Sequence, residues 1–366
     1  MPVLDKIIIS GFKNIGFQEL AFSSGINCIT GDNGEGKTNL IDAIYYLSMT
    51  KSAFSQSDKF NSLNGCGKFS LSGLYSFENG LSNRYSVSVS EAGKTVKVND
   101  KVYERLSDHI GVLPIVLVSP NDVSLVNGFG EERRKFMNAI ISQLDKDYLK
   151  AHQGYGRLLQ QRNSILKSGR PDPALLEAVD SRLAVHAAYI YDKRSYFAGK
   201  MLPIVRQYYK DVSGTGEDVD MVYRSDLQKG DCLSVLKDTL DRDIAMGHTT
   251  SGIHRDDMEF TIEGMPLRKC GSQGQQKSFT VALKFAQFSI MRDEYGFPPL
   301  MLLDDLFDKL DPHRVSNLLK IVIGTGFGQI FLTDCNAERM RRMVDGMTEE
   351  KAYFQACKGS FTVLEP

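Results

Sequence analysis

Apolar runs in the first part of the chain predict strands that lead into a glycine-rich loop and then a helix. Residues 4–10 and 17–22 have strand-like patterns, and residues 26–30 form a short apolar run typical of a buried strand. After the loop, residues 39–47 carry apolar side chains at helical spacing. The order strand, loop, helix is the beginning of an α/β core.

Shorter strand patterns follow this helix. Residues 51–67 are rich in Ser, Gly, Asn and Lys and indicate an irregular loop. Residues 69–76, 84–89 and 95–98 are separated by turn residues, which predicts an antiparallel meander. Residues 114–118 form a compact apolar strand that we expect to return to the main sheet.

Helical spacing dominates from about residue 122 to residue 240. Residues 133–144, 146–167 and 173–201 carry apolar side chains three and four positions apart. A clear helix break lies between the last two segments. This middle part of the chain is the size of a compact inserted lobe.

The α/β pattern returns after residue 240. The predicted elements are strands at 258–262, 299–303, 329–333, 353–357 and 360–364, with helices at 272–292 and 313–323. We therefore expect an α/β protein whose core comprises residues 1–120 and 241–366. Residues 121–240 form the predicted helical insertion.

Composition narrows the class of protein. The chain has 366 residues, 42% hydrophobic and 24% charged, with a net charge of −1, so binding to nucleic acid requires a local basic patch. Its six cysteines are scattered without a Cys-x-x-Cys pair, which favours free thiols in a reducing compartment. No apolar run approaches the roughly 20 residues of a membrane span, so we expect a cytoplasmic protein.

The glycine-rich loop is the strongest chemical signal. It comprises Gly31, Asp32, Asn33, Gly34, Glu35, Gly36, Lys37 and Thr38, followed by Asn39 at the helix start. The pattern fits a phosphate-binding loop, in which backbone N–H groups and the helix N-terminus hold phosphates. Lys37 is expected to reach the β- and γ-phosphates of ATP, and Thr38 to bind Mg²⁺. The alternative is a glycine-rich turn without a ligand.

A second signal is the apolar strand that ends in Asp304 and Asp305. This is the Walker B arrangement, which places carboxylates at the end of a strand where ligands collect in open α/β sheets. We expect Asp304 to bind Mg²⁺ opposite Thr38, and Asp305 to orient the attacking water. The alternative is a strand followed by an acidic turn.

A third signal precedes the predicted helix 272–292. Ser272, Gln273, Gly274 and Gln275 combine a good N-cap with small and polar residues that can present N–H groups to an anion. ABC-type ATPases carry a similar Ser-Gly-Gly-Gln signature at this point in the chain. In that class it faces the nucleotide of a second subunit, so the site is complete only in a dimer. The alternative is an ordinary capped helix.

Further candidates are weaker. Residues 308–311 follow Walker B, where such enzymes cross the dimer interface, and Thr333-Asp334 ends the next strand, where a γ-phosphate sensor usually lies. Arg133, Arg134, Lys135 and Arg162 are candidate DNA contacts. The alternative for this basic set is a solvated helix surface with local ion pairs, because Glu131 and Glu132 precede it.

In this order the motifs resemble the RecF family of bacterial recombination-mediator ATPases. Further similar stretches are residues 11–14, 119–123, 133–136, 161–167 and 254–257. The resemblance implies an ABC-type P-loop ATPase head with an inserted α-helical lobe, and an ATP-dependent homodimer that binds DNA. It also implies work with RecR and RecO in loading RecA at single-strand gaps.

The sequence leaves three functions open. The first is a DNA-binding ATPase that acts as a switch, with slow turnover because Asp305 has one methylene fewer than the more usual Glu. The second is a nucleotide-gated scaffold without significant hydrolysis. The third is another P-loop protein, either a transporter ATPase subunit or a small-molecule kinase.

Overall fold

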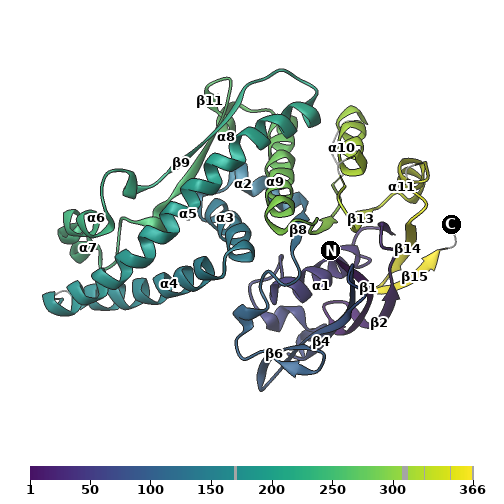
Figure 1. The fold of residues 1–366 in the computed structure, drawn as a ribbon, viewed down its shortest axis with the longest axis horizontal. Coiled ribbons are helices and arrows are strands. Elements are labelled where there is room, and N and C mark those ends of the chain that lie inside the picture. The colour runs from purple at the N-terminus through teal and green to yellow at the C-terminus, as the bar shows by residue number, and fades with distance from the viewer. Residues whose placement is uncertain (169–170, 307–311, 325, 347, 365–366) are drawn as a thin grey trace. The chain divides into compact units, whose positions relative to one another are not determined.

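The computed structural model describes residues 1–168, 171–306, 312–324, 326–346 and 348–364 (Figure 1). The chain forms two compact units. The head unit comprises residues 1–122, 211–214 and 284–366, and the lobe unit comprises residues 123–210 and 215–283. The structure divides the chain after residue 122, near the predicted boundary after residue 120. It groups residues 241–283 with the lobe unit, whereas the prediction placed residues 241–366 in the head.

A mostly parallel sheet organises the head unit. Its strands are β3 (Ile26–Thr30), β8 (Ile115–Val118), β12 (Leu300–Leu303), β13 (Ile330–Asp334), β14 (Lys351–Cys357) and β15 (Ser360–Leu364). They lie in the order β15-β14-β3-β13-β12-β8, and only the β14–β15 pair is antiparallel. Parallel pairing brings the carboxyl ends of β3, β12 and β13 to one edge.

An antiparallel sheet forms the second layer of the head unit. Its strands are β1 (Pro2–Phe12), β2 (Ile15–Ala21), β4 (Phe69–Phe77), β5 (Ser82–Ser90), β6 (Gly93–Val98) and β7 (Lys101–Val102). The order is β2-β1-β4-β5-β6-β7. The meander predicted from residues 69–98 is therefore present, and β1 pairs with its first strand.

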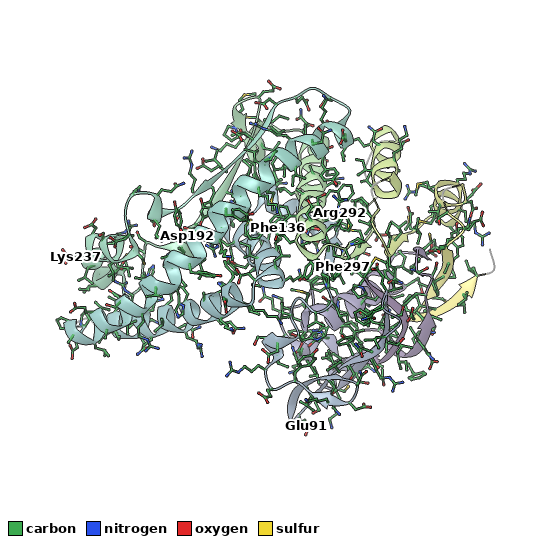
Figure 2. The ribbon with its side chains drawn as sticks, in the orientation of Figure 1. Glu91, Phe136, Asp192, Lys237, Arg292 and Phe297 are labelled. Atoms are coloured by element: carbon green, nitrogen blue, oxygen red, sulfur yellow. The ribbon has the colours of Figure 1, made fainter. Side chains whose placement is uncertain are left out.

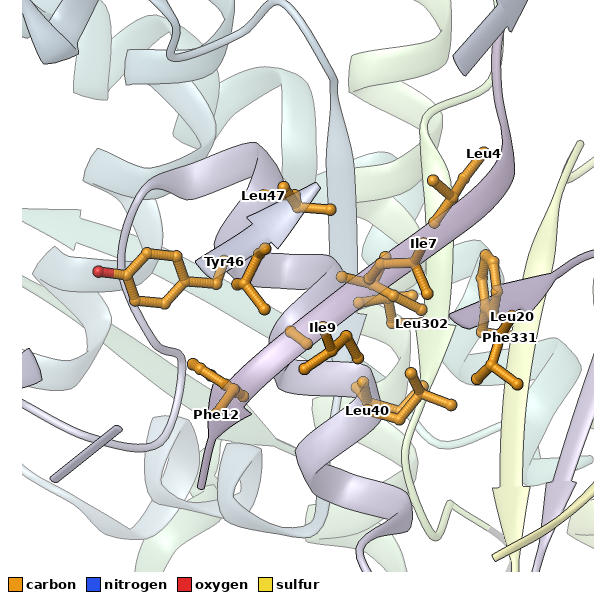
Figure 3. Packing of buried hydrophobic residues seen from close by; sticks show 14 of the residues in the cluster. Leu4, Ile7, Ile9, Phe12, Leu20, Leu40, Tyr46, Leu47, Leu302 and Phe331 are labelled. Atoms are coloured by element: carbon orange, nitrogen blue, oxygen red, sulfur yellow. The ribbon is translucent and has the colours of Figure 1, made fainter. Parts of the chain in front are cut away.

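Helix α1 (Lys37–Met49) packs against both sheets of the head unit. Figure 3 shows Leu40 and Leu47 of this helix among side chains of β1 and of the parallel sheet. Leu302 and Phe331 are fully buried in the same cluster. Burial of side chains this large contributes about 2 kcal/mol each. The core therefore fixes the helix whose first turn carries Lys37 and Thr38. Helices α10 (Pro312–Gly324) and α11 (Ala337–Val344) complete this unit.

The lobe unit is helical with one small sheet. Its elements are α2 (Ser124–Asn127), α3 (Gly130–Leu144), α4 (Lys146–Leu166), α5 (Pro173–Ser213), β9 (Val219–Arg224), α6 (Cys232–Asp238), α7 (Leu240–Met246), β10 (Asp257–Ile262), β11 (Met265–Pro266), α8 (Leu267–Cys270) and α9 (Gln273–Tyr295). The C-terminal ends of α5 and α9 fall within segments of the head unit.

Strand pairing explains the extent of the lobe unit. β9 pairs antiparallel with β10, so a strand before residue 240 is joined to one after it.

Figure 2 shows Phe136 of α3, a buried residue, and Lys237 of α6, which is exposed. In the described part of the chain, no helix is both long and apolar enough to cross a membrane.

Candidate nucleotide site

The glycine-rich loop connects β3 to α1 as predicted. Gly31 has φ 149°, and a Cβ there would lie 2.6 Å from the carbonyl oxygen of Ala356. Gly36 has φ 109° and precedes the first helical residue, Lys37. Both positions require glycine, because an L side chain rarely adopts such φ values. The exposed tip comprises Asp32, Asn33 and Gly34.

Lys37 is turned back over its own loop. Its ammonium donates to the carbonyl oxygens of Gly31 at 2.7 Å and Asp32 at 3.1 Å, and the side chain is almost fully buried. An ammonium carries three N–H donors on a flexible stem and is a strong phosphate ligand. The loop therefore holds a positive charge at the N-terminus of α1, where the helix dipole has the same sign.

Asp304 meets Thr38 at the edge where β3 and β12 end. The Thr38 hydroxyl lies 3.1 Å and 3.0 Å from the two carboxylate oxygens of Asp304. Thr333, near the end of β13, donates a further hydrogen bond of 2.8 Å to Asp304 Oδ1. Three residues distant in the chain thus form one oxygen-rich cluster.

This cluster fits a magnesium ion. Mg²⁺ prefers oxygen ligands and is usually bound by one or two carboxylates together with substrate phosphates. Burial, together with a smaller effect of the neighbouring Asp305 charge, raises the pKa of Asp304 to about 6. A divalent cation would relieve this electrostatic cost by favouring the ionised carboxylate. Thr38 and Asp304 are the residues that would hold it.

Asp305 follows directly and has an unusual backbone conformation. Its φ is 43°, in the left-handed region that Asp tolerates better than most residues. Its N–H donates to the Thr333 hydroxyl at 2.8 Å. Thr333 therefore accepts from Asp305 and donates to Asp304, which fixes the two acidic residues relative to each other. Thr333, at the position expected for the γ-phosphate sensor, therefore contacts the Walker B carboxylate of Asp304.

Two residues outside the predicted site, Asn14 and Gly359, also contact the loop and the start of α1. Asn39 donates to Asn14 Oδ1 at 2.8 Å, and a Cβ on Gly36 would lie 2.9 Å from the same oxygen. The carbonyl of Glu35 accepts from the N–H of Gly359 at 2.9 Å. The turn after β1 and the turn after β14 therefore both support the loop. Asn14 lies in residues 11–14, a stretch that resembles the family, but only the tertiary structure shows that it pairs with Asn39.

The predicted signature begins α9 in the lobe unit. Ser272 Oγ accepts from the N–H of Gln275 at 3.2 Å, and Gln275 Oε1 accepts from the N–H of Ser272 at 2.7 Å. This reciprocal pair is a capping box. The N–H groups of Gln273 and Gly274 lie in the first turn, where a helix has no earlier carbonyl to accept from them. The helix start thus has the geometry of an anion site.

Comparison with known proteins decides the family. The chain matches the RecF/RecN/SMC N terminal domain over residues 3–355. A "DNA replication and repair protein RecF" of Parabacteroides distasonis is 39% identical over 363 residues, covering 99% of this chain and 100% of the relative. The chain belongs to the RecF family. A RecF of Porphyromonas gingivalis is 40% identical over 98% of this chain and 99% of its own length.

Solved structures agree with the RecF assignment. The structure described as "the recombination mediator protein RecF-ATP in RecFOR pathway" has a TM-score of 0.89 at 27% identity, covering 100% of this chain and 98% of that chain. An Smc head domain from Pyrococcus furiosus has a TM-score of 0.59 at 15% identity, covering 100% of this chain and 96% of that chain, which supports the fold alone. The predicted fold class, an ABC-type ATPase head with helical content, is confirmed.

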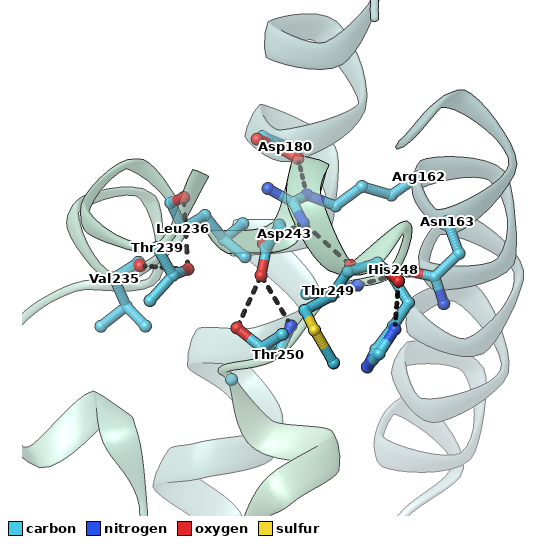
Figure 4. Close-up of polar contacts among 12 residues, drawn as sticks. Arg162, Asn163, Asp180, Val235, Leu236, Thr239, Asp243, His248, Thr249 and Thr250 are labelled. Atoms are coloured by element: carbon cyan, nitrogen blue, oxygen red, sulfur yellow. Dashed lines mark hydrogen bonds and ion pairs between the residues drawn. The ribbon is translucent and has the colours of Figure 1, made fainter. Parts of the chain in front are cut away.

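The four basic residues predicted to contact DNA differ in their burial and in their partners. Arg162 is fully buried and pairs with Asp180 at 2.7 Å and Asp243 at 2.6 Å (Figure 4). It also donates to Thr249 Oγ1 at 2.9 Å, joining α4 to α5, α7 and the loop after α7. We therefore withdraw Arg162 as a DNA contact, because its guanidinium is enclosed by acidic partners.

Arg133 is also structural. Its guanidinium pairs with Asp257 at 2.5 Å and donates to the carbonyls of Leu125 and Gly128. We withdraw it as a DNA contact, because its guanidinium is buried and is held by one carboxylate and two carbonyls. Arg134 donates to the carbonyl of Asp256 at 2.7 Å, and burial lowers its pKa.

Lys135 remains accessible, but acidic neighbours lie beside it. Its side chain is 53% exposed and pairs with Glu131 at 2.8 Å and Glu132 at 3.1 Å, which raise its pKa. This is the local ion-pair arrangement that the sequence left as the alternative. Lys135 and Arg134 stay in the proposed set.

Two further candidates of this RecF-family chain have definite outcomes. His254, given no firm role from sequence, lies between the Tyr155 hydroxyl at 2.8 Å and the Thr249 carbonyl at 3.1 Å, and burial lowers its pKa to about 4. Asp334 is held by Arg339 at 2.7 Å. The proposed interface segment, residues 308–311, lies outside the described residues.

Proposed function

We propose that this RecF-family chain is an ATP-gated switch that binds DNA in recombinational repair and replication restart. The observation that carries this proposal is the cluster of Thr38, Asp304 and Thr333 next to the phosphate loop. It combines a phosphate cradle with an oxygen donor set that suits Mg²⁺. A relative of this family is described as RecF-ATP, which supports the choice of nucleotide.

The proposed roles follow from position. Backbone groups of residues 31–39 bind the phosphates, and the Lys37 ammonium exchanges its carbonyl partners for phosphate oxygens. Thr38 and Asp304 hold Mg²⁺, which would neutralise charge on the phosphates. Asp305 orients the attacking water by accepting its proton or a hydrogen bond from it.

A second copy of the chain completes the site in this proposal. Ser272, Gln273, Gly274 and Gln275 provide the start of α9, which bonds the terminal phosphate held by the partner's loop. The capping geometry of Ser272 supports this role, because the first-turn N–H groups favour an anion. ATP would then join two heads, and hydrolysis would release them together with DNA.

The partners are proposed from the family. Solved relatives are described as recombination mediators in the RecFOR pathway, which supports work with RecO and RecR in loading RecA at gaps. DNA contact is assigned to Lys135 and Arg134 only, because Arg133 and Arg162 are engaged inside the lobe unit.

ATP-dependent dimerisation tests the central claim. The mass of the protein in solution should double with ATP and Mg²⁺ when measured by light scattering. Ser272→Arg should stay monomeric, because a long side chain blocks the approach of a phosphate to the first turn, while ATP still binds its own loop. A wild-type protein that stays monomeric at saturating ATP and Mg²⁺ contradicts the proposal.

The scaffold alternative keeps one supporting observation. Asp305 is shorter than the Glu usual at this position, which favours slow hydrolysis. Asp305→Asn is the discriminating variant, because Asn tolerates the left-handed backbone at this residue. If hydrolysis drives the cycle, this variant should bind ATP and DNA but release DNA more slowly. Normal release from gapped DNA would favour the scaffold.

A further inference from the structure

The signature residue Gln275 has a second partner in the lobe unit. Its Nε2 donates to Glu217 Oε1 at 2.7 Å, while its Oε1 accepts from the N–H of Ser272. Glu217 lies in the connection between α5 and β9, far from α9 in sequence. A residue outside every motif thus contacts the capping box.

Both oxygens of the Glu217 carboxylate are engaged. Oε2 accepts from the Tyr209 hydroxyl at 2.7 Å and from the Thr215 hydroxyl at 2.8 Å, and Oε1 accepts from Gln275. Tyr209 is fully buried, and its ring centroid lies 6.3 Å from that of Phe279 on α9. The carboxylate is therefore held by Tyr209 near the end of α5, by Thr215 in the following connection and by Gln275 of α9.

The chemistry of these groups determines the direction of the amide. An ionised carboxylate only accepts hydrogen bonds, whereas an amide has one accepting and one donating end. Glu217 therefore requires the Nε2 end of Gln275 to face it, which leaves Oε1 facing the N–H of Ser272. The opposite orientation would place two donors together at Ser272 and two acceptors together at Glu217.

We infer that Glu217 is a positioning residue for the nucleotide site that Ser272 completes on a second copy of the chain. It fixes the Gln275 amide, and the amide fixes the backbone and hydroxyl of Ser272. Ser272 Oγ accepts from the Gln275 N–H, which leaves its own hydrogen available to donate to a phosphate oxygen of the nucleotide. This inference rests on the proposed function.

The same contacts connect the end of a long lobe helix to the signature. Tyr209 belongs to α5, which runs from Pro173 to Ser213. Any change in the last turns of α5 would move the Tyr209 hydroxyl and hence the Glu217 carboxylate. In this proposal the dimer site is therefore sensitive to the position of the end of α5.

The test separates dimer formation from binding of ATP by one protomer. Glu217→Ala removes the acceptor, and we expect ATP-dependent dimerisation to weaken about tenfold, the usual effect of losing a hydrogen bond to a charged group. Affinity for a fluorescent ATP analogue, measured at protein concentrations below dimerisation, should stay within about twofold of wild type. Glu217→Gln retains one accepting oxygen and should restore most of the dimerisation.

Controls keep the outcome clear. Glu259→Gln removes the same charge from an exposed pair with Arg224 in the lobe unit, and it should dimerise like wild type. Tyr209→Phe removes one donor to Glu217 and should have an intermediate effect, which decides the question if Glu217→Ala fails to fold.

Two results overturn the inference in distinguishable ways. Glu217→Ala or Tyr209→Phe, whichever folds, dimerising like wild type would show that Glu217 does not position the signature, while the proposed function stands. A wild-type protein that never dimerises with ATP would contradict both this inference and the proposed function.

Discussion

Thr38 and Asp304 are 266 positions apart in the chain, yet the Thr38 hydroxyl lies 3.0 Å from the nearer carboxylate oxygen. The contact exists because β3 and β12 are both paired in parallel with β13, so that their carboxyl ends share one edge. The phosphate loop and the Walker B strand thus form one site.

Lys37 should dominate the affinity for ATP. Lys37→Met removes a buried ammonium at the N-terminus of α1 and should weaken ATP binding about a hundredfold, as expected for loss of two charge-assisted hydrogen bonds. Titration with a fluorescent ATP analogue measures this. Lys101→Met, at an exposed position of β7, is the matched control and should bind normally. Equal affinity of both variants would show that the loop does not bind phosphate through Lys37.

The magnesium-dependent part of ATP binding should depend on pH. In the proposed site, Mg²⁺ would bind the ionised form of Asp304, whose pKa burial raises to about 6. Lowering the pH below this value should weaken binding of Mg·ATP about tenfold per pH unit, because protons compete with the metal. Calorimetric titrations at pH 5.5 and 7.5, with Mg²⁺ and with EDTA, test this. The same pH profile in EDTA would argue against Asp304 as the ligand.

The same carboxylate should cost stability when no nucleotide is bound. A folded-state pKa of about 6, above the value of 3.8 for an unperturbed Asp, means that folding disfavours the ionised form. The contribution of the protonated carboxyl group to the free energy of unfolding is complete below pH 3.8 and is lost as the pH rises through 6. Asp304→Asn should therefore raise the free energy of unfolding at pH 8 by on the order of 2 kcal/mol, and by much less at pH 4.5.

Urea unfolding at the two pH values measures this effect. Asn can still accept from Thr333 through Oδ1, so the comparison isolates the charge. A variant less stable than wild type at pH 8 would mean that the lost hydrogen bonds outweigh the removed charge.

Arg162 should matter for folding of the lobe unit. Arg162→Ala leaves Asp243 buried without its cation, and such a loss costs about 3 to 5 kcal/mol. The free energy of unfolding should fall by this amount, while the head unit keeps its affinity for ATP. Arg182→Ala, an exposed residue on α5, is the control and should change stability by less than about 0.5 kcal/mol. Equal stability of both variants would contradict the buried contact.

Lys135 should affect DNA binding with little effect on stability. Its ion pairs with Glu131 and Glu132 are exposed, so Lys135→Ala should change the free energy of unfolding by less than about 1 kcal/mol. If it contacts a phosphate, the slope of log affinity against log salt should become less steep by about 1. Glu131→Gln should strengthen binding, because it frees the Lys135 charge. No response to either variant would exclude this contact.

The sequence by itself determined the local chemistry of the candidate nucleotide site. The phosphate loop, the acidic end of β12 and the serine that caps α9 were predicted at the residues where the structure has them, because each depends on neighbours within a few positions. Apart from the two-residue β7, the strands of the head unit's two sheets were predicted from apolar periodicity for the same reason. The family followed from the order of these motifs.

Only the tertiary structure decided which charges are available and which residues support the motifs. Arg162 and Lys135 look alike in sequence, but one is enclosed by Asp180 and Asp243 while the other reaches solvent. The end of the lobe depended on pairing of β9 with β10, and the link from Glu217 to Gln275 depended on two distant segments meeting. Burial and long-range pairing are properties of the folded chain, and no local pattern encodes them.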